Sequence, residues 1–434
     1  MKMDDFLARV LGQMKSKAGR ELVEKELRHH LNESSKAYKK AGYTEEEASA
    51  KAVQDMGDPD DLGLKMNRLH RPVMDWPLLI VAGLLLAISM LPVFLVKNEI
   101  GGIMTYQWLS LFASSIVLVG CMLFPYEKLL SWWKIWLAMG MGILLLTLMP
   151  IFSLTVNGKV YFSPLGGTMD MMVVNFLLLL GWIGYLLIAK RKPLPLTILL
   201  VWLPVMFLTF LTHYIAAFAY FSLSLFTYFL KSSKQREKIT FLLVNVCLLV
   251  IAVTFYISIA PQHQIDRVLG WLRTEQYSSS FGYIPFINQD LLQHSVFFGR
   301  GSSQFAQTMV ELRYNTDLVL LFLIHEIGWV PALSILALFV YAIVRFVRTS
   351  RRTPDLKGSV LVIGATTLIV VPLMMGVFMN IGWLPIIKHS VPMLSFGIGQ
   401  QMYYSGLIGI ILNVYRHQYV VIDRGLKGAG TKAP

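Results

Sequence analysis

The 434-residue chain is poor in charge: only 15% of its residues are Asp, Glu, Lys or Arg, whereas 55% are hydrophobic. Its mean hydropathy is +0.57. Average soluble domains carry about 25% charged residues, which form their polar surface. The composition therefore excludes an ordinary soluble enzyme or binding module and indicates a protein whose surroundings are largely lipid.

Several site-forming patterns are also lacking. The two cysteines, Cys121 and Cys247, lie inside apolar runs, so neither a disulfide framework nor a Cys/His zinc site is expected. His325 and Glu326 do not belong to an HExxH motif, and the chain has no GxxxxGK[ST] loop. We therefore identify no cofactor and no metal ligands, while a divalent cation stays open. Any chemistry must use an activated substrate, a gradient, or no energy source.

Long apolar runs are abundant. About 20 apolar residues in a helix cross a ~30 Å hydrocarbon core. Nine stretches are long enough to do so, and the longest of them has room for two helices that turn near residues 211–213. The stretches are 77–96, 107–124, 135–156, 171–189, 194–230, 239–260, 318–344, 358–379 and 397–415. The sequence thus predicts an all-α polytopic membrane protein with about ten transmembrane helices.

Residues 1–75 differ from the rest because they hold 14 basic and 14 acidic residues and no long apolar run. Thr44 and Glu47 form a capping-box pattern, Gly57 is typical of a helix end, and Pro59 of the next start. We expect a small soluble helical domain, which resembles the helical prefix domains found before some bacterial permeases. It is either a solvated appendage or a partner-binding or regulatory module.

The charges between the apolar runs are unevenly distributed. Ten spans put both termini on one side of the membrane. After residue 75, the loops and tail on that side carry 18 Lys/Arg and 4 Asp/Glu, against 7 and 8 in the opposite loops. Cytoplasmic loops are the ones enriched in Lys and Arg. Both termini, with the tail 417–434, are therefore predicted to be cytoplasmic, and the net charge of +13 indicates contact with anionic lipid rather than nucleic acid.

The connection 261–316, predicted to lie outside, is far longer than an ordinary loop. It contains several aromatic residues and the arginines Arg267, Arg273, Arg300 and Arg313. The arginine guanidinium is planar and holds phosphate oxygens with two hydrogen bonds. This composition suits an amphiphile with an anionic head, although an ordinary interfacial loop with an aromatic belt would look similar.

Acidic residues stand at and within the next apolar run. Asp317 falls at its outer end, where Asp is also a good helix N-cap. In one continuous helix Glu326 would lie about 13.5 Å deeper, on the opposite face. The two are therefore not expected to act as a catalytic carboxylate pair. Glu326 is expected to face other helices, either protonated or paired with a polar group, because a charge at membrane depth is costly.

Two stretches resemble signatures of the SEDS family (shape, elongation, division and sporulation proteins, the FtsW/RodA/SpoVE group). After the outer loop, RYNTDL keeps the Thr-Asp of the family motif at Thr316 and Asp317, and HEIGW keeps Glu326 and Gly328. The second stretch, NIGWLPIIKHSVPMLSFG, spans residues 380–397 and matches the signature between the last two spans. Its matching residues are Asn380, Gly382, Pro385, Pro392, Ser395 and Gly397. The resemblance covers residues 76–416, the expected membrane domain.

The chain also departs from these signatures. Leu312 and Arg313 replace the Pro-Glu before the Thr-Asp, and Lys388 replaces a glycine. Residues 398–400 replace a Gly-Ser-Ser, and the prefix domain is not typical of the family. The chain therefore resembles a divergent member.

The resemblance implies a peptidoglycan glycosyltransferase of the bacterial cytoplasmic membrane that polymerises lipid II, a disaccharide-pentapeptide on undecaprenyl pyrophosphate. It also implies a class B penicillin-binding protein, a transpeptidase, as partner, in elongation, division or sporulation. Asp317 would be the catalytic base. The residues that would bind pyrophosphate or sugar are Arg267, Gln289, Arg300, Arg313, Lys388 and Ser395. Structural or coupling roles would fall to Glu326, Asn380, Pro385 and Pro392.

Two other functions remain open from the sequence. A non-catalytic scaffold for the transpeptidase would not need Asp317. A flippase for lipid-linked precursors should carry polar residues at mid-membrane depth in several spans. The six runs before the outer connection, which make up the first seven spans, carry almost none except His213, which weakly disfavours transport.

Overall fold

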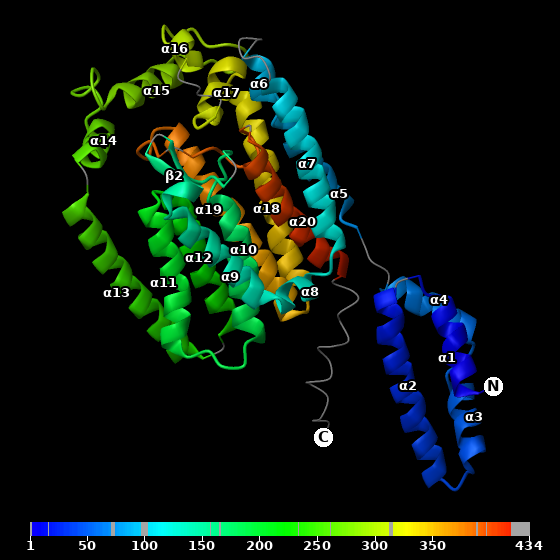
Figure 1. The fold of residues 1–434 in the computed structure, drawn as a ribbon. Helices are drawn as coiled ribbons and strands as arrows, with labels where there is room; N and C mark the ends of the chain where they lie inside the picture. Colours follow the sequence, from blue (N-terminus) through cyan, green and yellow to red (C-terminus); the bar gives the residue numbers. More distant parts are fainter. Residues whose placement is uncertain are drawn as a thin grey trace. The chain divides into compact units, whose positions relative to one another are not determined.

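The fold is described from a computed structural model (Figure 1). The structure describes residues 2–15, 17–70, 74–96, 103–156, 158–164, 166–232, 234–260, 262–311, 316–387, 389–395 and 397–417. The chain divides into two compact units. The first is built on the residues up to Asp75, and the second spans Trp76–Arg352 and Leu356–Val414.

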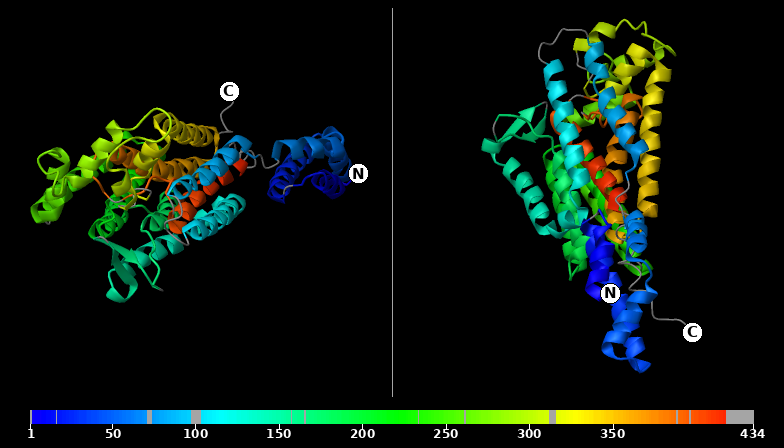
Figure 2. Two further views of the ribbon diagram at one scale, coloured as in Figure 1. Left: turned by 90° about the horizontal axis from the view of Figure 1, so that it is seen from above. Right: turned by 90° about the vertical axis from the view of Figure 1, so that its right-hand side faces the viewer.

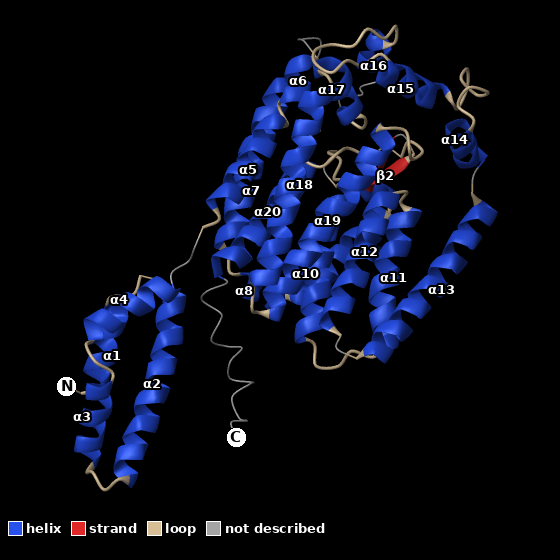
Figure 3. Ribbon diagram, turned by 180° about the vertical axis from the view of Figure 1, so that it is seen from behind, coloured by secondary structure: helices blue, strands red, loops and turns tan. Residues whose placement is uncertain are grey.

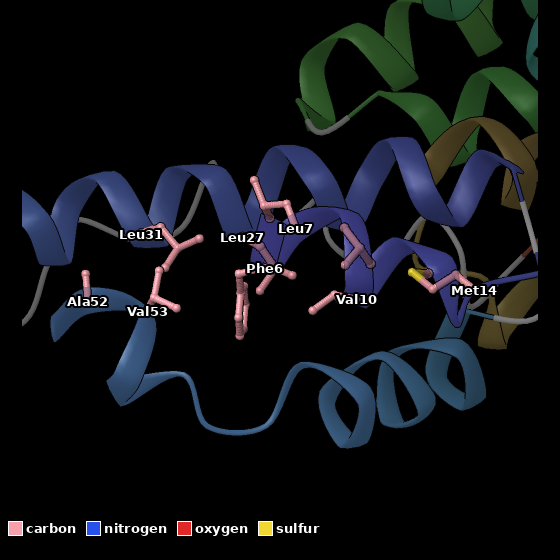
Figure 4. Close-up of a cluster of buried hydrophobic side chains, with 9 residues drawn as sticks. Phe6, Leu7, Val10, Met14, Leu27, Leu31, Ala52 and Val53 are labelled. Carbon is pink, nitrogen blue, oxygen red and sulfur yellow. The ribbon is translucent and has the colours of Figure 1, made fainter. Parts of the chain in front are cut away.

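The first unit is a small helical domain. Its helices are α1 (Met3–Gly12), α2 (Lys17–Lys40), α3 (Glu45–Asp55) and α4 (Pro59–His70). Figure 4 shows side chains of the first three helices meeting in one apolar cluster. The buried residues of this cluster are Phe6, Leu7, Val10, Met14, Val23, Leu27, Leu31, Ala52 and Val53. The domain therefore has an apolar core of its own.

Its helix boundaries follow the sequence signals. The Thr44 side chain accepts a hydrogen bond from the backbone of Glu47, and the Glu47 carboxylate accepts one from the backbone of Thr44, which confirms the capping box. Gly57 after α3 has a φ of 78°, a conformation that costs glycine little. Pro59 then begins α4 as predicted.

The second unit is a helical bundle with one short hairpin (Figure 3). Its first half comprises α5 (Trp76–Ile88), α6 (Leu91–Leu95), α7 (Ile103–Leu123), α8 (Tyr126–Ser131), α9 (Trp133–Thr147), η1 (Pro150–Phe152), β1 (Ser153–Val156), β2 (Lys159–Phe162), α10 (Met172–Ile188) and α11 (Leu194–Phe210). Its second half comprises α12 (Tyr214–Lys231), α13 (Gln235–Ile259), α14 (Gln262–Leu272), α15 (Tyr283–Gln293), α16 (Ala306–Glu311), α17 (Val319–Ile327), α18 (Trp329–Arg352), α19 (Leu356–Asn380) and α20 (Ile398–His417).

Six helical segments of the described chain are long and apolar enough to cross a membrane, judged by length and composition. They are Trp76–Leu95, Met104–Leu123, Tyr214–Lys231, Gln235–Ser258, Trp329–Arg352 and Leu356–Asn380. Three shorter apolar helices, α9, α10 and α11, lie among them. Every predicted span contains a helix, and the 194–230 run folds into two helices around His213, as expected. The unit is a polytopic all-α membrane protein.

Burial separates inner from outer helices. In α19, 67% of the residues in an 18-residue apolar stretch are buried inside the protein. In α13, which stands at the edge of the bundle in Figure 1, the share is 11%. Apolar side chains that cover the outside of a bundle suit contact with lipid tails. Buried helices approach closely through glycine: a Cβ on Gly184 of α10 would lie 2.1 Å from the Cβ of Trp133.

Two predicted spans end differently from the sequence expectation. The run 135–156 is not one helix: α9 stops at Thr147, and the chain then passes through η1 into β1. Pro150 explains this, because proline disfavours helical conformation in the residue before it. β2 pairs antiparallel with β1 in a register that sets Ser153 opposite Phe162 and Val156 opposite Lys159.

The predicted helix 318–344 is also broken. Helix α17 ends at Ile327 and α18 begins at Trp329, with Gly328 between them at a φ of 96°. A Cβ at Gly328 would lie 2.6 Å from the Phe297 carbonyl oxygen. Glu326 is the penultimate residue of the nine-residue helix α17. Because of this break the prediction of one spanning helix over residues 318–344 is wrong, and Asp317 lies outside α17, two residues before Val319.

The described part of the long connection, residues 262–311, forms the three helices α14, α15 and α16. In Figures 1 and 2 these helices, α17 and the hairpin gather at the same end of the bundle. The backbone N–H groups of Gly299 and Gly301 donate to the carbonyls of Ile327 and His325, at 3.0 and 2.7 Å. This end of the bundle is therefore an ordered cap.

Candidate functional site

The hairpin is fixed to the turn between α11 and α12. The backbone N–H of Val160 donates to the Leu211 carbonyl at 3.3 Å, and the Thr212 hydroxyl donates to the Gly158 carbonyl at 2.7 Å. The His213 Nε2 donates to the Val160 carbonyl at 2.9 Å, and its ring meets that of Tyr161 edge-on at 5.3 Å between centroids. These contacts position Lys159 at the start of β2.

Next to this turn the chain forms a small polar pocket with room for about one water molecule, of roughly 10 Å³. Lys159, Asp170, His213 and His389 all line it. They come from β2, from the residues before α10, from the α11–α12 turn and from the segment after α19. Four regions far apart in the sequence thus bring ionisable side chains to one point.

Asp170 is held as a carboxylate in this pocket. One oxygen accepts from the backbone N–H of Met172 at 2.8 Å, and the other accepts from the Gln400 amide at 3.0 Å. The Ser390 hydroxyl donates to the other end of the same Gln400 amide. Burial acts to raise the pKa of Asp170, but the charge of His213 in its protonated form, the Met172 N–H and Lys159 outweigh it and lower the pKa. Asp170 is therefore a charged partner for nearby cations and a weak base.

The two histidines are held in their neutral form. Burial lowers the pKa of His213, against the opposing effect of Asp170. Burial, followed by the charge of Lys159, lowers the pKa of His389 to about 4. The buried His389 Nε2 has no hydrogen-bond partner within the described residues. At neutral pH the permanent cation of the pocket is thus Lys159.

Asp317 lies near the same hairpin. Burial, then the charge of Asp170 and then that of Asp317 raise the pKa of Tyr161 to about 12. Both carboxylates therefore lie within electrostatic range of the Tyr161 hydroxyl. The N-cap of α17 is Leu318, whose side chain cannot accept a hydrogen bond. Asp317 precedes the cap position, so the prediction that it could serve as the N-cap is wrong.

Beside the polar pocket runs an apolar groove of about 390 Å³. Its walls come from α13, α14, the hairpin turn, the α11–α12 turn and the segment after α19. The lining residues are Gly158, Lys159, Thr212, Tyr214, Tyr256, Ile257, Ala260, His263, Gln264, Ile265, Arg267, Val268, Pro385, Ile386 and Ile387. The groove lies at the end of α13 that leads into α14, and α13 has the smallest buried share, 11%, of the six long apolar helical segments of the described chain.

The groove and the polar pocket share part of their walls. Lys159, Tyr214 and Ile387 line both. A molecule lying in the groove would therefore bring one end to Lys159, next to Asp170. An apolar channel that ends at a cation fits an amphiphile with an anionic head group.

The candidate site residues predicted from sequence are distributed as follows. Arg267 and Pro385 line the groove. Gln289 is exposed on α15, away from both cavities, whereas Pro392 and Ser395 are buried in the segment between α19 and α20. Arg313 and Lys388 lie outside the described residues.

Arg300 and Glu326, predicted separately, form one ion pair. The Arg300 Nε lies 3.1 Å from a carboxylate oxygen of Glu326, and that oxygen is 3.4 Å from the Nδ1 of the buried His325. Asn380, at the end of α19, accepts from the backbone N–H of Leu321 at 2.9 Å and donates to the Gly376 carbonyl at 2.7 Å. These contacts hold α17 against the connection 262–311 and against α19.

Sequence reasoning did not single out Lys159, Asp170, His389 or Gln400 as site residues. A signal for the first two was present, because they are the charged residues of the short connection 157–170 between two apolar runs. His389 lies inside the second family signature at a position where the signature specifies no residue, and Gln400 stands where the family has a serine. Within the described part of the chain, no group of three or more His, Cys, Asp or Glu is arranged to hold a metal ion.

Comparison with known proteins agrees with this architecture. Residues 72–420 match the family model for the FtsW, RodA and SpoVE cell cycle proteins. Stage V sporulation protein E of Bacillus subtilis is 30% identical over 160 residues, which cover 37% of this chain and 44% of that protein. A probable peptidoglycan glycosyltransferase FtsW of Trichlorobacter lovleyi is 22% identical over 160 residues, or 37% and 42% of the two chains. The chain thus spans less than half the length of these curated relatives.

A solved structure shares the fold. It comes from work described as "Structural coordination of polymerization and crosslinking by a peptidoglycan synthase complex" and superposes with a TM-score of 0.66 at 18% identity. The match covers 80% of this chain and 99% of the other. Because the family model spans nearly all of the membrane unit, the chain belongs to the FtsW, RodA and SpoVE family of bacterial membrane proteins.

Proposed function

We propose that the protein is a peptidoglycan glycosyltransferase that polymerises lipid II at the outer face of the cytoplasmic membrane. The observation that carries this proposal is the shared wall of the apolar groove and the polar pocket at Lys159. The undecaprenyl chain of the substrate would lie in the groove, beside α13. The pyrophosphate would then meet Lys159, and Arg267 further along the groove.

The reaction joins an acceptor hydroxyl to the anomeric carbon of a second lipid-linked sugar. As the new C–O bond forms, the bond to pyrophosphate breaks and undecaprenyl pyrophosphate leaves. A base must take the hydroxyl proton, and a cation must stabilise the leaving charge. We assign the base to Asp317 and the cation to Lys159. Asp170, whose pKa is lowered, is better suited to positioning Lys159 than to accepting a proton.

The substrate supplies its own energy, because the leaving pyrophosphate is already attached to the sugar. This agrees with the absence of a nucleotide-binding loop from the sequence. Arg313, Lys388, Gln289 and Ser395 remain proposed substrate contacts on the resemblance alone. A divalent cation bridging the pyrophosphate also remains a proposal.

A transpeptidase partner is the second part of the proposal. The similar structure comes from a complex described as coordinating polymerization with crosslinking. We therefore propose a class B penicillin-binding protein as the partner of this chain, with both termini of the chain in the cytoplasm.

The proposal is tested by incubating the purified full-length chain with lipid II and separating the products on a gel. Glycan strands made without any partner would support a polymerase. A scaffold gives strands only when an active glycosyltransferase is added. A flippase gives none but moves fluorescent lipid II across proteoliposome membranes, and that result would refute the assignment.

A further inference from the structure

A second cavity, of about 460 Å³, lies at the other end of the bundle. It is formed where α10 and α12 end and where α11 and α13 begin. Its walls are Leu186, Lys192, Leu194, Thr197, Tyr228, Lys231, Arg236, Glu237 and Thr240. The 17 residues of α10 separate it from the hairpin end, about 26 Å at the rise of an α-helix. The cavity is therefore distinct from the site described above.

The walls of this cavity carry excess positive charge. Three cations, Lys192, Lys231 and Arg236, face a single carboxylate, that of Glu237. That carboxylate already has two partners, because one oxygen lies 3.3 Å from Lys234 Nζ and the other accepts from the Ser232 hydroxyl at 3.2 Å. Within the described residues, no ion pair engages any of the three lining cations. The cavity thus presents cationic donors without a counter-ion.

The positive charges of Lys192 and Lys231 repel each other. Burial, and then the charge of Lys231, lower the pKa of Lys192. Like charges held close together in a partly buried wall are unfavourable unless an anion lies between them. Because two helices begin and two end at the cavity, their dipoles largely cancel. The positive potential therefore comes from the side chains.

We propose that this cavity binds the phosphate of an anionic phosphate ester, supplied either by a phospholipid head group or by a soluble phosphate compound. Three cationic side chains can surround the phosphate oxygens, and the hydroxyl of Thr240 adds a donor. Leu186 and Leu194 provide apolar wall beside them. A basic pocket between helix ends on the cytoplasmic side suits a lipid head group.

The test uses the full-length protein in a neutral detergent. Dioctanoylphosphatidylglycerol, dioctanoylphosphatidylcholine and inorganic phosphate are added separately, and the melting temperature is recorded. We expect phosphatidylglycerol to raise the melting temperature more than phosphatidylcholine does. If inorganic phosphate gives the full shift, the site is one for soluble phosphate compounds, and if phosphatidylglycerol alone does, the source is lipid.

A matched pair of variants distinguishes ligand binding in the cavity from an effect of general surface charge. The first combines Lys192→Gln, Lys231→Gln and Arg236→Gln. The second combines Lys190→Gln, Arg191→Gln and Lys238→Gln, which removes the same charge from the same two helix junctions, α10–α11 and α12–α13, at residues outside the cavity lining. The shift should fall at least twofold in the first variant only. An equal loss in both variants would overturn the proposal, as would no shift in the wild type.

A second readout needs no variant and so does not depend on folding of the triple mutant. Lysines of the wild-type protein are acetylated with and without the ligand and quantified by mass spectrometry. The ligand should protect Lys192 and Lys231 by several fold and leave the exposed Lys190 unchanged. Equal protection of all three lysines would contradict a defined site.

Discussion

At the scale of single residues, Lys159 links the two halves of the proposed substrate site. It lies at the start of β2, in the walls of both the groove and the polar pocket. Its position depends on the hairpin contacts with Thr212 and His213 rather than on a helix. Because the hairpin lies at the end of the bundle, it can place the Lys159 ammonium where a lipid head group would lie.

Removing the charge of Lys159 should slow polymerisation. Lys159→Gln keeps the length of the side chain and loses the cation, so we expect a fall of about 10²-fold or more in rate, as for loss of one preorganised electrostatic contact. Lys134→Gln, at the start of α9, is the control and should stay near the wild-type rate. Equal rates for both variants would remove Lys159 from the mechanism.

Acid should destabilise the folded protein through the ionisable groups of the polar pocket. The pKa of His389 is about 4 in the folded protein, below its ordinary value of about 6.5. Between these values the unfolded chain binds a proton that the folded chain does not, so stability is lost as the pH falls from 6.5 toward 4. The lowered pKa of Asp170 acts in the same direction, at lower pH.

The variant His389→Asn isolates the histidine effect. Its melting temperature should fall less steeply between pH 6.5 and 4 than that of the wild type, by an amount equivalent to at most about 3 kcal/mol. Parallel curves for wild type and His389→Asn would show that His389 is not held neutral.

At the scale of elements, the break between α17 and α18 fixes the cap. Gly328 combines a positive φ with a Cβ position 2.6 Å from the Phe297 carbonyl oxygen. The backbone N–H groups of Trp329 and Val330 donate to the carbonyls of Val296 and Phe297, at 3.0 and 3.1 Å. The break therefore joins the outer connection to the start of α18.

Gly328→Ala should strain this junction. We expect a loss of about 1–3 kcal/mol in stability, the usual cost of forcing a side chain into such a conformation. Gly142→Ala, in α9 with open space around its Cβ, should be neutral or slightly stabilising. Melting temperatures of the two variants in detergent measure the difference, and equal values would show that the break tolerates a side chain.

Helices were more predictable than the places where they stop. Apolar runs located all the spanning helices because burial in lipid demands length and hydrophobicity. The same runs concealed the ends at Pro150 and Gly328, since apolar residues also fill strands and short cap helices. The Gly328–Pro331 spacing did carry a stop-and-start signal that hydropathy alone does not show.

The site was only partly predictable for a related reason. Asp317 was found from its motif, whereas Asp170, His213, His389 and Lys159 converge through tertiary packing of four segments. Nothing in their sequence spacing encodes that convergence. The Arg300–Glu326 pair likewise joins two residues that were predicted independently.

At the scale of the whole molecule, the account requires the cap to face outward and the basic loops to face the cytoplasm. In a chain with Cys121→Ser and Cys247→Ser, a membrane-impermeant maleimide added to intact cells should label Ser279→Cys and not Gln235→Cys. Both positions are exposed in the structure, so accessibility within the protein does not decide the result. The reverse pattern would contradict the proposed outer-face chemistry.

The most direct test of the central claim is the rate of lipid II polymerisation by Asp317→Asn. Asn keeps the shape of the side chain but cannot accept the proton, so the rate should fall by about 10²–10⁴-fold, the range for loss of a general base. The melting temperature of this variant should stay within a few degrees of the wild type, because Asn keeps the size of the side chain and can still form hydrogen bonds. A polymerisation rate of Asp317→Asn near that of the wild type would contradict the account.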